Sequence, residues 1–246
     1  MFINSYVPEN GWRNPVQTPD RAQFKALLGG ADRRLSSAVG EFNFLPSRYA
    51  HPSWLACLPH GALLVRLRDS PRIAQRLSRH LLAEWELEDR YCFDFSARPA
   101  RLALIDGAVL ARLVLYAGLT ATASYARRAV ERDKVAAIKR CIGAPAFLFA
   151  LKRAPFLGGA APAPTDLRQQ TVEAFHAASL AAGMRQLAAC LQEQEPALLQ
   201  RLLFKLPKDW RDWFTPREPC APQSAGERLF TQLIVELEPQ WKHLVA

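Results

Sequence analysis

The most apolar window of this 246-residue chain runs from Leu102 to Ala126, and it constrains the fold more than any other segment. A stretch of this length could cross a bilayer as a helix. It carries Asp106 and Arg112, however, arginines flank it, and charges near the centre of a membrane span are costly. We therefore expect a buried core helix. Because it is apolar on nearly all sides, other elements must surround it.

The rest of the chain is patterned for helices. Ile73, Leu77, Leu81 and Trp85 fall four residues apart, which is a helical stripe on one face. No sustained alternation of apolar and polar residues occurs, and β-branched runs are few. The sequence predicts a mainly α-helical protein with an irregular multi-helix globular fold and little or no sheet.

Prolines mark many of the expected helix boundaries, because proline fits the first turn of a helix and disrupts its interior. Thr18-Pro19 and Ser70-Pro71 each combine a cap residue with a proline and predict helix starts. Pro46 and Pro52 exclude a long helix through residues 42–55. Further helices are expected at residues 124–140, 144–152 and 166–194, from Pro196 to before Pro207, and between a loop at 215–225 and Pro239.

The predicted domain organisation has three parts. Residues 1–18 lack an apolar period and are expected to form a flexible leader. The sequence GGAAPAPT at 158–165 is the clearest linker signal in the chain. It would separate an N-terminal helical lobe at 19–157, which contains the basic helix, from a C-terminal helical lobe at 166–246, although the two can also form one continuous domain.

The cysteines and the N-terminus point to a cytoplasmic protein. The five cysteines are odd in number and widely spaced, and no two form a CxxC pair, so free thiols in a reducing compartment are expected. The N-terminal residues show no basic segment followed by an apolar one, which is the pattern of a secretory signal.

The net charge of +9 is concentrated in the middle of the chain. Residues 98–153 carry 11 basic and 3 acidic side chains. The basic block is RRAVERDKVAAIKR at 127–140, where a single helix would project Arg128, Arg132 and Lys139 to roughly one side, with Arg127 and Lys134 nearby. Such a block is either a solvated helix face or a binding surface for nucleic acid, an anionic membrane or an acidic protein.

The motifs of common catalytic and cofactor sites are missing. There is no GxxxxGK[ST] or GxGxxG for phosphate, no HExxH for zinc and no GxSxG elbow. His51 and Cys57 lie close in sequence, but partners in a catalytic pair usually meet through the fold. We therefore expect a binding or scaffold protein with no catalytic residues, no metal and no cofactor.

Three segments carry a family resemblance. They are FNFLPSRYAHPSWL at 42–55, LLQRLLFKLPKDW at 198–210 and ERLFTQLIVELEPQWKHL at 227–244. In these segments, and in the order of the helices at 101–152, the chain resembles the SctK family, also called the YscK family, of type III secretion accessory proteins. The matching features of the first segment are Phe44, Pro46, Tyr49, His51, Trp54 and Leu55. The resemblance covers roughly residues 40–246, and the longer N-terminal leader departs from it.

The resemblance implies a helical, non-enzymatic cytoplasmic protein of the type III secretion sorting platform. Such a protein joins the cytoplasmic domain of an SctD-type inner-membrane ring protein to an SctQ-type pod protein. The pods lead indirectly to the stator and the ATPase. It implies a position at the cytoplasmic face of the inner membrane that is peripheral, not spanning, and it implies no cofactor.

Two groups of side chains are candidates for partner binding under this reading. They are Tyr49, His51 and Trp54 in the aromatic segment, and Arg127, Arg128, Arg132, Lys139 and Arg140 in the basic block. Aromatic and arginine side chains carry interface energy well. The alternative for Tyr49 and Trp54 is structural, because both could staple the N-terminal helix to the core.

Other functions stay open at this point. The runner-up is a nucleic-acid-binding regulatory protein that uses the basic block at 127–140, but no recognised module accompanies the charge, so nucleic acid is not the expected partner. An enzyme built around His51 and Cys57 would need a perturbed thiol at the base of a closed pocket. Export chaperones are usually smaller, acidic and dimeric, unlike this chain.

Overall fold

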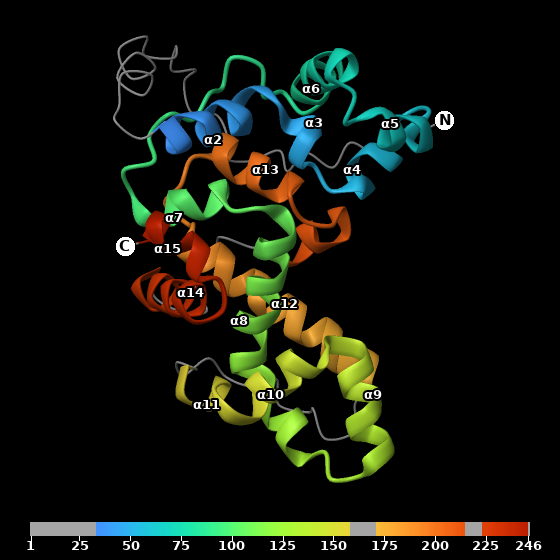
Figure 1. Cartoon of the computed structure of the whole chain (residues 1–246), viewed down its shortest axis with the longest axis vertical. Helices are drawn as coiled ribbons and strands as arrows, with labels where there is room; N and C mark the ends of the chain where they lie inside the picture. The colour runs from blue at the N-terminus through green and yellow to red at the C-terminus, as the bar shows by residue number, and fades with distance from the viewer. Residues whose placement is uncertain (1–32, 158–170, 215–222, 246) are drawn as a thin grey trace.

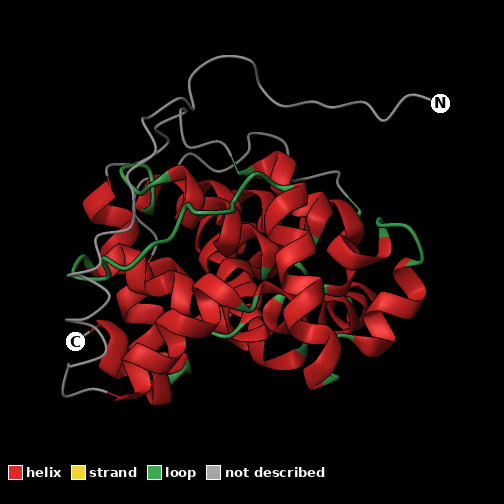
Figure 2. Ribbon diagram, turned by 90° about the horizontal axis from the view of Figure 1, so that it is seen from above, coloured by secondary structure: helices red, strands yellow, loops and turns green. Residues whose placement is uncertain are grey.

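The computed structural model of the chain describes residues 33–157, 171–214 and 223–245. Within them all regular structure is helical and no strand occurs, which confirms the predicted fold class (Figure 2). The flexible leader, the helix start at Thr18-Pro19 and the 158–165 linker lie outside the described residues.

The longer helices run in chain order through most of the protein. They are α2 (Arg33–Phe44), α5 (Gly61–Leu67), α6 (Pro71–Glu84), α8 (Gly107–Arg128), α9 (Arg132–Ile142), α10 (Ala144–Lys152), α12 (Val172–Cys190), α13 (Pro196–Phe204) and α14 (Gln223–Leu237). Short helices connect them, namely α3 (Pro46–Tyr49), α4 (Pro52–Ala56), α7 (Arg98–Arg101), η1 (Leu102–Leu104), α11 (Ala154–Leu157), η3 (Lys208–Trp213), η4 (Pro239–Trp241) and α15 (Lys242–Val245).

Helices α8 and α12 form the central pair of the molecule and make its most extensive helix–helix contact (Figure 1). Their backbones meet at two glycines. A Cβ atom added to Gly118 would lie 1.7 Å from the carbonyl oxygen of Ser179, and one added to Gly183 would lie 1.9 Å from that of Val114. One turn further along α8, the hydroxyls of Thr122 and Ser179 hydrogen-bond at 2.7 Å. Only glycine permits so close a crossing at both positions.

The apolar stretch that ends the N-terminal half is a buried core helix, as predicted. By length and composition α8 is the one helix among the described residues that could cross a membrane, but 56% of its apolar stretch is buried inside the protein. Asp106 caps its N-terminus by accepting hydrogen bonds from the backbone N–H groups of Ala108 and Val109. Arg112 forms an ion pair with Glu238 at 2.5 Å. Both charges inside the apolar window therefore have structural partners.

One hydrophobic core runs through the described residues. It includes Phe42 and Trp54 from the N-terminal segments, Leu119 from α8, and Phe204 and Phe230 from the C-terminal helices. Helices α2 to α6 and α13 lie at one end of the long axis, and α9, α10 and α11 lie at the other (Figure 1). Elements before and after residues 158–170 thus pack into a shared core.

Pro71 and Pro196 are confirmed as helix starts, and Pro46 and Pro52 are confirmed to exclude a long helix through residues 42–55, where α2 ends and only short helices follow. Pro46, Pro52, Pro71 and Pro196 each occupy the first turn of a helix. Helix α14 ends at Leu237, just before the 3-10 turn that begins at Pro239. The side chain of Ser70, expected as a cap of α6, makes no capping hydrogen bond, so proline alone marks that start.

The predicted single helix at 124–140 is wrong. Helix α8 continues to Arg128, the chain turns at 129–131, and α9 begins at Arg132. The turn lets α9 pack on α10 and α12 and bury Ile138 and Ile142. A straight continuation of α8 would carry those two side chains away from the core, and burial of apolar area outweighs local helix propensity.

One loop boundary near the C-terminus also differs from the prediction. The loop expected at 215–225 ends earlier, because α14 already begins at Gln223. Glu238, the residue that follows α14, is buried. Its carboxylate pairs with Arg112 and accepts a hydrogen bond from Gln240 at 2.6 Å, and a buried carboxylate needs such partners.

The segment 85–97 has no helix or strand, but it is held from inside the protein. The buried side chain of Asn43 accepts a hydrogen bond from the N–H of Cys92 at 2.7 Å and donates one to its carbonyl at 2.8 Å. The buried guanidinium of Arg201 on α13 donates to the carbonyls of Leu87 at 3.1 Å and Arg90 at 2.7 Å. Buried backbone groups that lack a ladder partner are thus satisfied by side chains.

Lys205 is a second buried cation of α13. Its Nζ donates to the carbonyl of Ile105 at 2.8 Å and lies 5.1 Å from the ring centre of Tyr49 and 5.5 Å from that of Phe42. Burial lowers the pKa of Lys205 from 10.5 to about 7, although the charges of Asp106 and Glu41 raise it. Burial disfavours the charged form of an amine.

We expect the free energy of unfolding to rise with pH above 7 because of Lys205. Between pH 7 and 10.5 the unfolded chain holds a proton that the folded chain has released, so the folded state gains stability as pH rises. One such group contributes at most about 1.4 kcal/mol per pH unit. Urea unfolding at several pH values between 7 and 8.5 measures this slope, and Lys205→Met should flatten it.

The matched control is Lys152→Met, which removes an exposed lysine and should leave the slope unchanged. The window ends below pH 9 because burial raises the pKa of Cys92 to about 11 and that of Cys190 to about 12. Those thiols oppose the lysine effect above pH 9, since the folded state then holds the extra protons. If the free energy of unfolding has the same slope against pH in the parent protein and in Lys205→Met, the pH dependence does not come from Lys205.

Candidate functional site

The aromatic segment at 42–55 lies against α13 and supplies part of the core. The side chain of Trp54 has 0% exposure. Its indole Nε1 donates to the carbonyl of Leu206 at 2.8 Å, and its ring packs edge-on against Phe204 and Trp85. The structure therefore favours the structural role of Trp54, and it leaves no exposed surface of that side chain for a partner.

Tyr49 and His51 also serve the local structure. The Tyr49 hydroxyl donates to the carbonyl of Phe42 at 2.7 Å, and burial raises the pKa of that hydroxyl. The His51 backbone N–H donates to the carbonyl of Phe204 at 2.6 Å. Its Nδ1 accepts from the backbone N–H of Ser53 and so caps α4, and burial lowers the pKa of His51.

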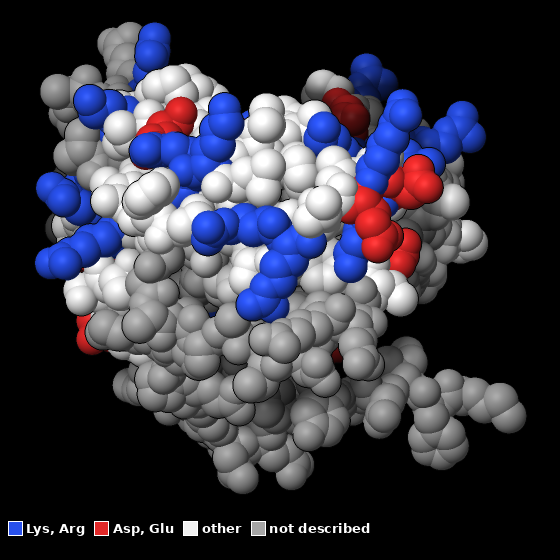
Figure 3. Space-filling view, turned by 90° about the horizontal axis from the view of Figure 1, so that it is seen from below, with Lys and Arg blue, Asp and Glu red and all other residues white. Residues whose placement is uncertain are grey.

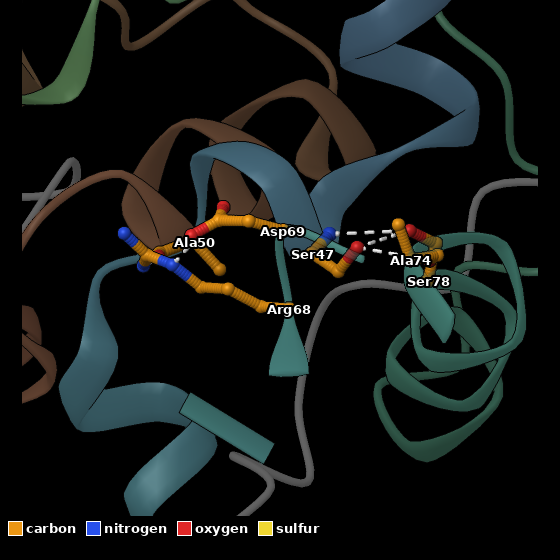
Figure 4. Close-up of polar contacts among 6 residues, drawn as sticks. All are labelled: Ser47, Ala50, Arg68, Asp69, Ala74 and Ser78. Carbon is orange, nitrogen blue, oxygen red and sulfur yellow. Dashed lines mark hydrogen bonds and ion pairs between the residues drawn. The ribbon is translucent and has the colours of Figure 1, made fainter. Parts of the chain in front are cut away.

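Hydrogen bonds fix the segment on two sides. Ser47 on α3 donates through Oγ to the carbonyl of Ala74 on α6 at 2.9 Å (Figure 4). The Ser78 hydroxyl accepts a hydrogen bond from the backbone N–H of Ser47 and donates one to the Ser47 Oγ. Arg68 donates to the carbonyl of Ala50 at 3.0 Å. Together with the hydrogen bonds of Trp54 to Leu206 and of His51 to Phe204, these bonds hold the first family-like segment between α6 and the end of α13.

The basic block is exposed, but it does not lie on one helix. Arg127 and Arg128 end α8, Arg132 starts α9, and Lys139 and Arg140 lie in the last turn of α9. All five side chains are exposed, and none forms a salt bridge within the described residues. In the view from the α9–α11 end, Lys and Arg side chains spread over the described surface, whereas Asp and Glu are few (Figure 3).

Exposed apolar side chains accompany this charge, and the sequence pattern did not reveal them. Val130, in the turn between α8 and α9, is 90% exposed, and Phe156 on α11 is 82% exposed. Leu148 on α10 is 49% exposed. Val130 lies three residues after Arg127 and two residues before Arg132. Phe156 lies three residues after Arg153. Single exposed apolar side chains are normal on protein surfaces, so these three mark a candidate surface only together with the neighbouring cations.

A cleft of about 540 Å³ is a second feature that sequence reasoning missed. Its walls come from α8, α9, α10, α12, η3 and α14, and they include Leu115, Tyr116, His176, Leu180 and Trp210 as well as the Arg112–Glu238 ion pair. Burial lowers the pKa of His176 and raises that of Tyr116. The cleft is therefore mainly apolar with one charged pair at its wall.

The arrangement gives little support to catalysis. Cys57 is exposed and is not part of the cleft wall, and its thiol contacts the carbonyl of Trp54 and the Nζ of Lys208. The side chain of His51 is hydrogen-bonded to Ser53, as the cap of α4 requires. In the described part of the chain, no three His, Cys, Asp or Glu side chains gather as metal ligands would.

Comparison with known protein families shows the family of the chain. A family model described as YOP proteins translocation protein K (YscK) matches residues 38–245. The chain belongs to the YscK family. The match begins in α2 and ends in α15, so it includes all three family-like segments, the basic block and the cleft. None of the curated proteins and none of the solved structures matches the chain.

Membership of the YscK family makes this a type III secretion protein. The family is a component of the secretion apparatus and not a known enzyme family, and it suggests a cytoplasmic, membrane-associated location. Among the described residues, the exposed basic block and the cleft are two candidate surfaces for a partner.

Proposed function

We propose that this YscK-family protein is a non-enzymatic adaptor of the type III secretion sorting platform. It links the cytoplasmic domain of an SctD-type inner-membrane ring protein to an SctQ-type pod protein, and through the pods it connects to the stator and the ATPase. The family match over residues 38–245 carries the proposal, because it spans nearly the whole described fold and not a single module.

The surface chemistry supports the proposal in two ways. An adaptor needs at least two binding surfaces of different character, and the mainly apolar cleft differs from the exposed cations at the α8–α9 turn. Within the described residues, Arg127, Arg128 and Arg132 also form no salt bridge that a partner would have to break. Unpaired surface charges raise association rates and select oppositely charged partners.

We expect Arg128→Glu combined with Arg132→Glu to weaken recruitment to the assembled ring by roughly 10-fold in Kd at physiological salt. Both side chains are exposed beside the α8–α9 turn, so charge reversal should repel an acidic surface without disturbing the core. Recruitment can be measured as the amount of protein that sediments with membranes carrying the assembled ring.

The matched control is Arg72→Glu with Arg76→Glu on α6. These two arginines are also exposed, and α6 lies at the opposite end of the long axis (Figure 1). The control changes the net charge equally and should keep normal recruitment. Normal recruitment of the Arg128→Glu, Arg132→Glu protein, with an unchanged unfolding midpoint, would remove the basic block from the binding surface.

The adaptor role itself is tested in solution without lipid. The full chain is mixed with the ring protein's cytoplasmic domain or with the pod protein, and the mass of each complex is measured by light scattering on a sizing column. Stable complexes with both proteins support the role. Binding to neither protein contradicts it. Affinity for duplex DNA with a steep salt dependence would then favour the nucleic-acid alternative.

A further inference from the structure

We propose that the end of the molecule formed by the α8–α9 turn, α10 and α11 binds directly to the surface of an anionic membrane. The term basic end is used for its exposed cations, which are Arg127, Arg128, Arg132, Lys139, Arg140, Lys152 and Arg153. The inference rests on the proposed function only for the presence of a membrane beside the molecule.

The charge of the basic end fits a layer of lipid phosphates. Between residues 127 and 153 the chain carries eight Lys or Arg against two acidic residues, Glu131 and Asp133. Within the described structure, Arg153 is the only one of the eight in a salt bridge, with Glu236. The Nζ atoms of Lys134 and Lys139 lie over aromatic rings, 4.8 Å from the ring centre of Tyr125 and 5.3 Å from that of Phe147. Clustered Lys and Arg beside a bilayer are attracted by its anionic lipids.

The apolar side chains of the same end favour a bilayer over a protein. Val130 and Phe156 are exposed by 90% and 82%, and they belong to two different elements, the α8–α9 turn and α11. A protein partner would need a separate complementary pocket for each side chain. A bilayer receives both without a pocket, because apolar groups insert between headgroups while neighbouring cations remain at the phosphates.

The geometry of the fold agrees with surface binding and not with insertion. Helix α8 has the length of a membrane span, but α10, α12 and α14 pack against it and bury its apolar face. To the cations of the basic end α8 contributes Arg127 and Arg128 of its C-terminal turn. Contact through the basic end would leave the α2–α6 end pointing away from the membrane (Figure 1).

The test is flotation of the full chain with vesicles and no other protein. One set of vesicles contains phosphatidylglycerol mixed with phosphatidylcholine, and the other contains phosphatidylcholine alone. We expect binding to the anionic set only, and weaker binding as salt increases. Arg127→Gln, Arg128→Gln and Arg132→Gln together should lower binding on the order of 100-fold, or roughly 5-fold per residue.

Matched variants separate a localised surface from bulk charge. Arg72→Gln, Arg76→Gln and Arg79→Gln remove three exposed cations from α6 and should retain near-parental binding. Phe156→Ser should lower binding roughly 10-fold while it keeps the salt dependence, because it removes apolar insertion and no charge. Circular dichroism and the unfolding midpoint confirm that each variant is folded.

Three results would overturn the inference. Absence of binding to phosphatidylglycerol vesicles, with a lipid-free ring complex that depends on Arg128 and Arg132, would assign the basic end to an acidic protein. An equal loss of binding in the α6 variant would show that binding depends on net charge and not on the basic end. Equal binding to both vesicle sets would show that the cations do not attract the vesicles. Failure of the adaptor proposal is recognised separately, because its complexes are measured without lipid.

Discussion

Replacement of Gly118 by alanine is expected to lower the free energy of unfolding by about 4 kcal/mol or more, which is the largest effect expected of one methyl group in this protein. The new Cβ would lie 1.7 Å from the carbonyl oxygen of Ser179 and 2.6 Å from its carbonyl carbon. Backbone atoms cannot rotate away as a side chain does, so α8 and α12 would have to separate along their crossing. Overpacking of a close-packed interior costs free energy even for small additions.

Gly40→Ala is the matched control for this prediction. Gly40 lies inside α2, and no atom lies within 4 Å of an added Cβ. Alanine should therefore stabilise the protein by about 0.5–1 kcal/mol through its higher helix propensity. Urea unfolding of both variants measures the difference. A Gly118→Ala protein with the parental midpoint would show that α8 and α12 do not cross at this distance in solution.

Trp54→Ala is expected to destabilise the protein by about 3–5 kcal/mol, because it leaves a large cavity between α4 and α13. The indole is fully buried, and its hydrogen bond to the carbonyl of Leu206 would be lost as well. An unsatisfied buried carbonyl adds to the cost. Urea unfolding gives the loss of stability, and binding to the ring and pod proteins should fall only as the folded fraction falls.

The control for Trp54 is Leu63→Ala on the neighbouring helix α5. Leu63 is 52% exposed, so its truncation should change the free energy of unfolding by no more than about 0.5 kcal/mol. A Trp54→Ala protein with parental stability that no longer binds the ring or the pod protein would instead support the interface role of the aromatic segment.

The features that were predictable from sequence depend only on residues that are close together in the chain. Proline fixes its own φ angle and lacks an N–H, so Pro71 marks a helix start, and Pro46 and Pro52 exclude a long helix through residues 42–55. The apolar character of α8 on nearly all sides required burial, and the structure provides it. The charge of the basic block was likewise visible, because charge is a property of composition.

The features that were missed depend on residues distant in the chain. The break after Arg128 has neither glycine nor proline, and it arises because Ile138 and Ile142 gain burial by turning back. Glu238 is buried because Arg112 on another helix pairs with it. No periodicity in a single segment reports either event, since tertiary packing overrides local preference.

The candidate site divides in the same way. The basic block was found, but the protrusion of Val130 and Phe156 is a tertiary property that residue type does not encode. The cleft has walls from six elements, so no sequence motif could announce it. Aromatic residues suit both cores and interfaces, so the sequence left the roles of Trp54 and Tyr49 open. The structure places the Trp54 indole in the core, where it is fully buried.

The attachment of residues 85–97 by Asn43 and Arg201 determines how this part of the protein can move. A surface loop usually detaches at little cost, because water replaces the contacts that it gives up. Here detachment would leave the Arg201 guanidinium and the Asn43 amide without these hydrogen-bond partners in an apolar interior, because both side chains lie on helices that remain in place. The segment without regular structure is therefore coupled to α2 and α13 as one cooperative unit. It can serve as a rigid edge of the protein, and partners that meet this edge encounter a preformed shape.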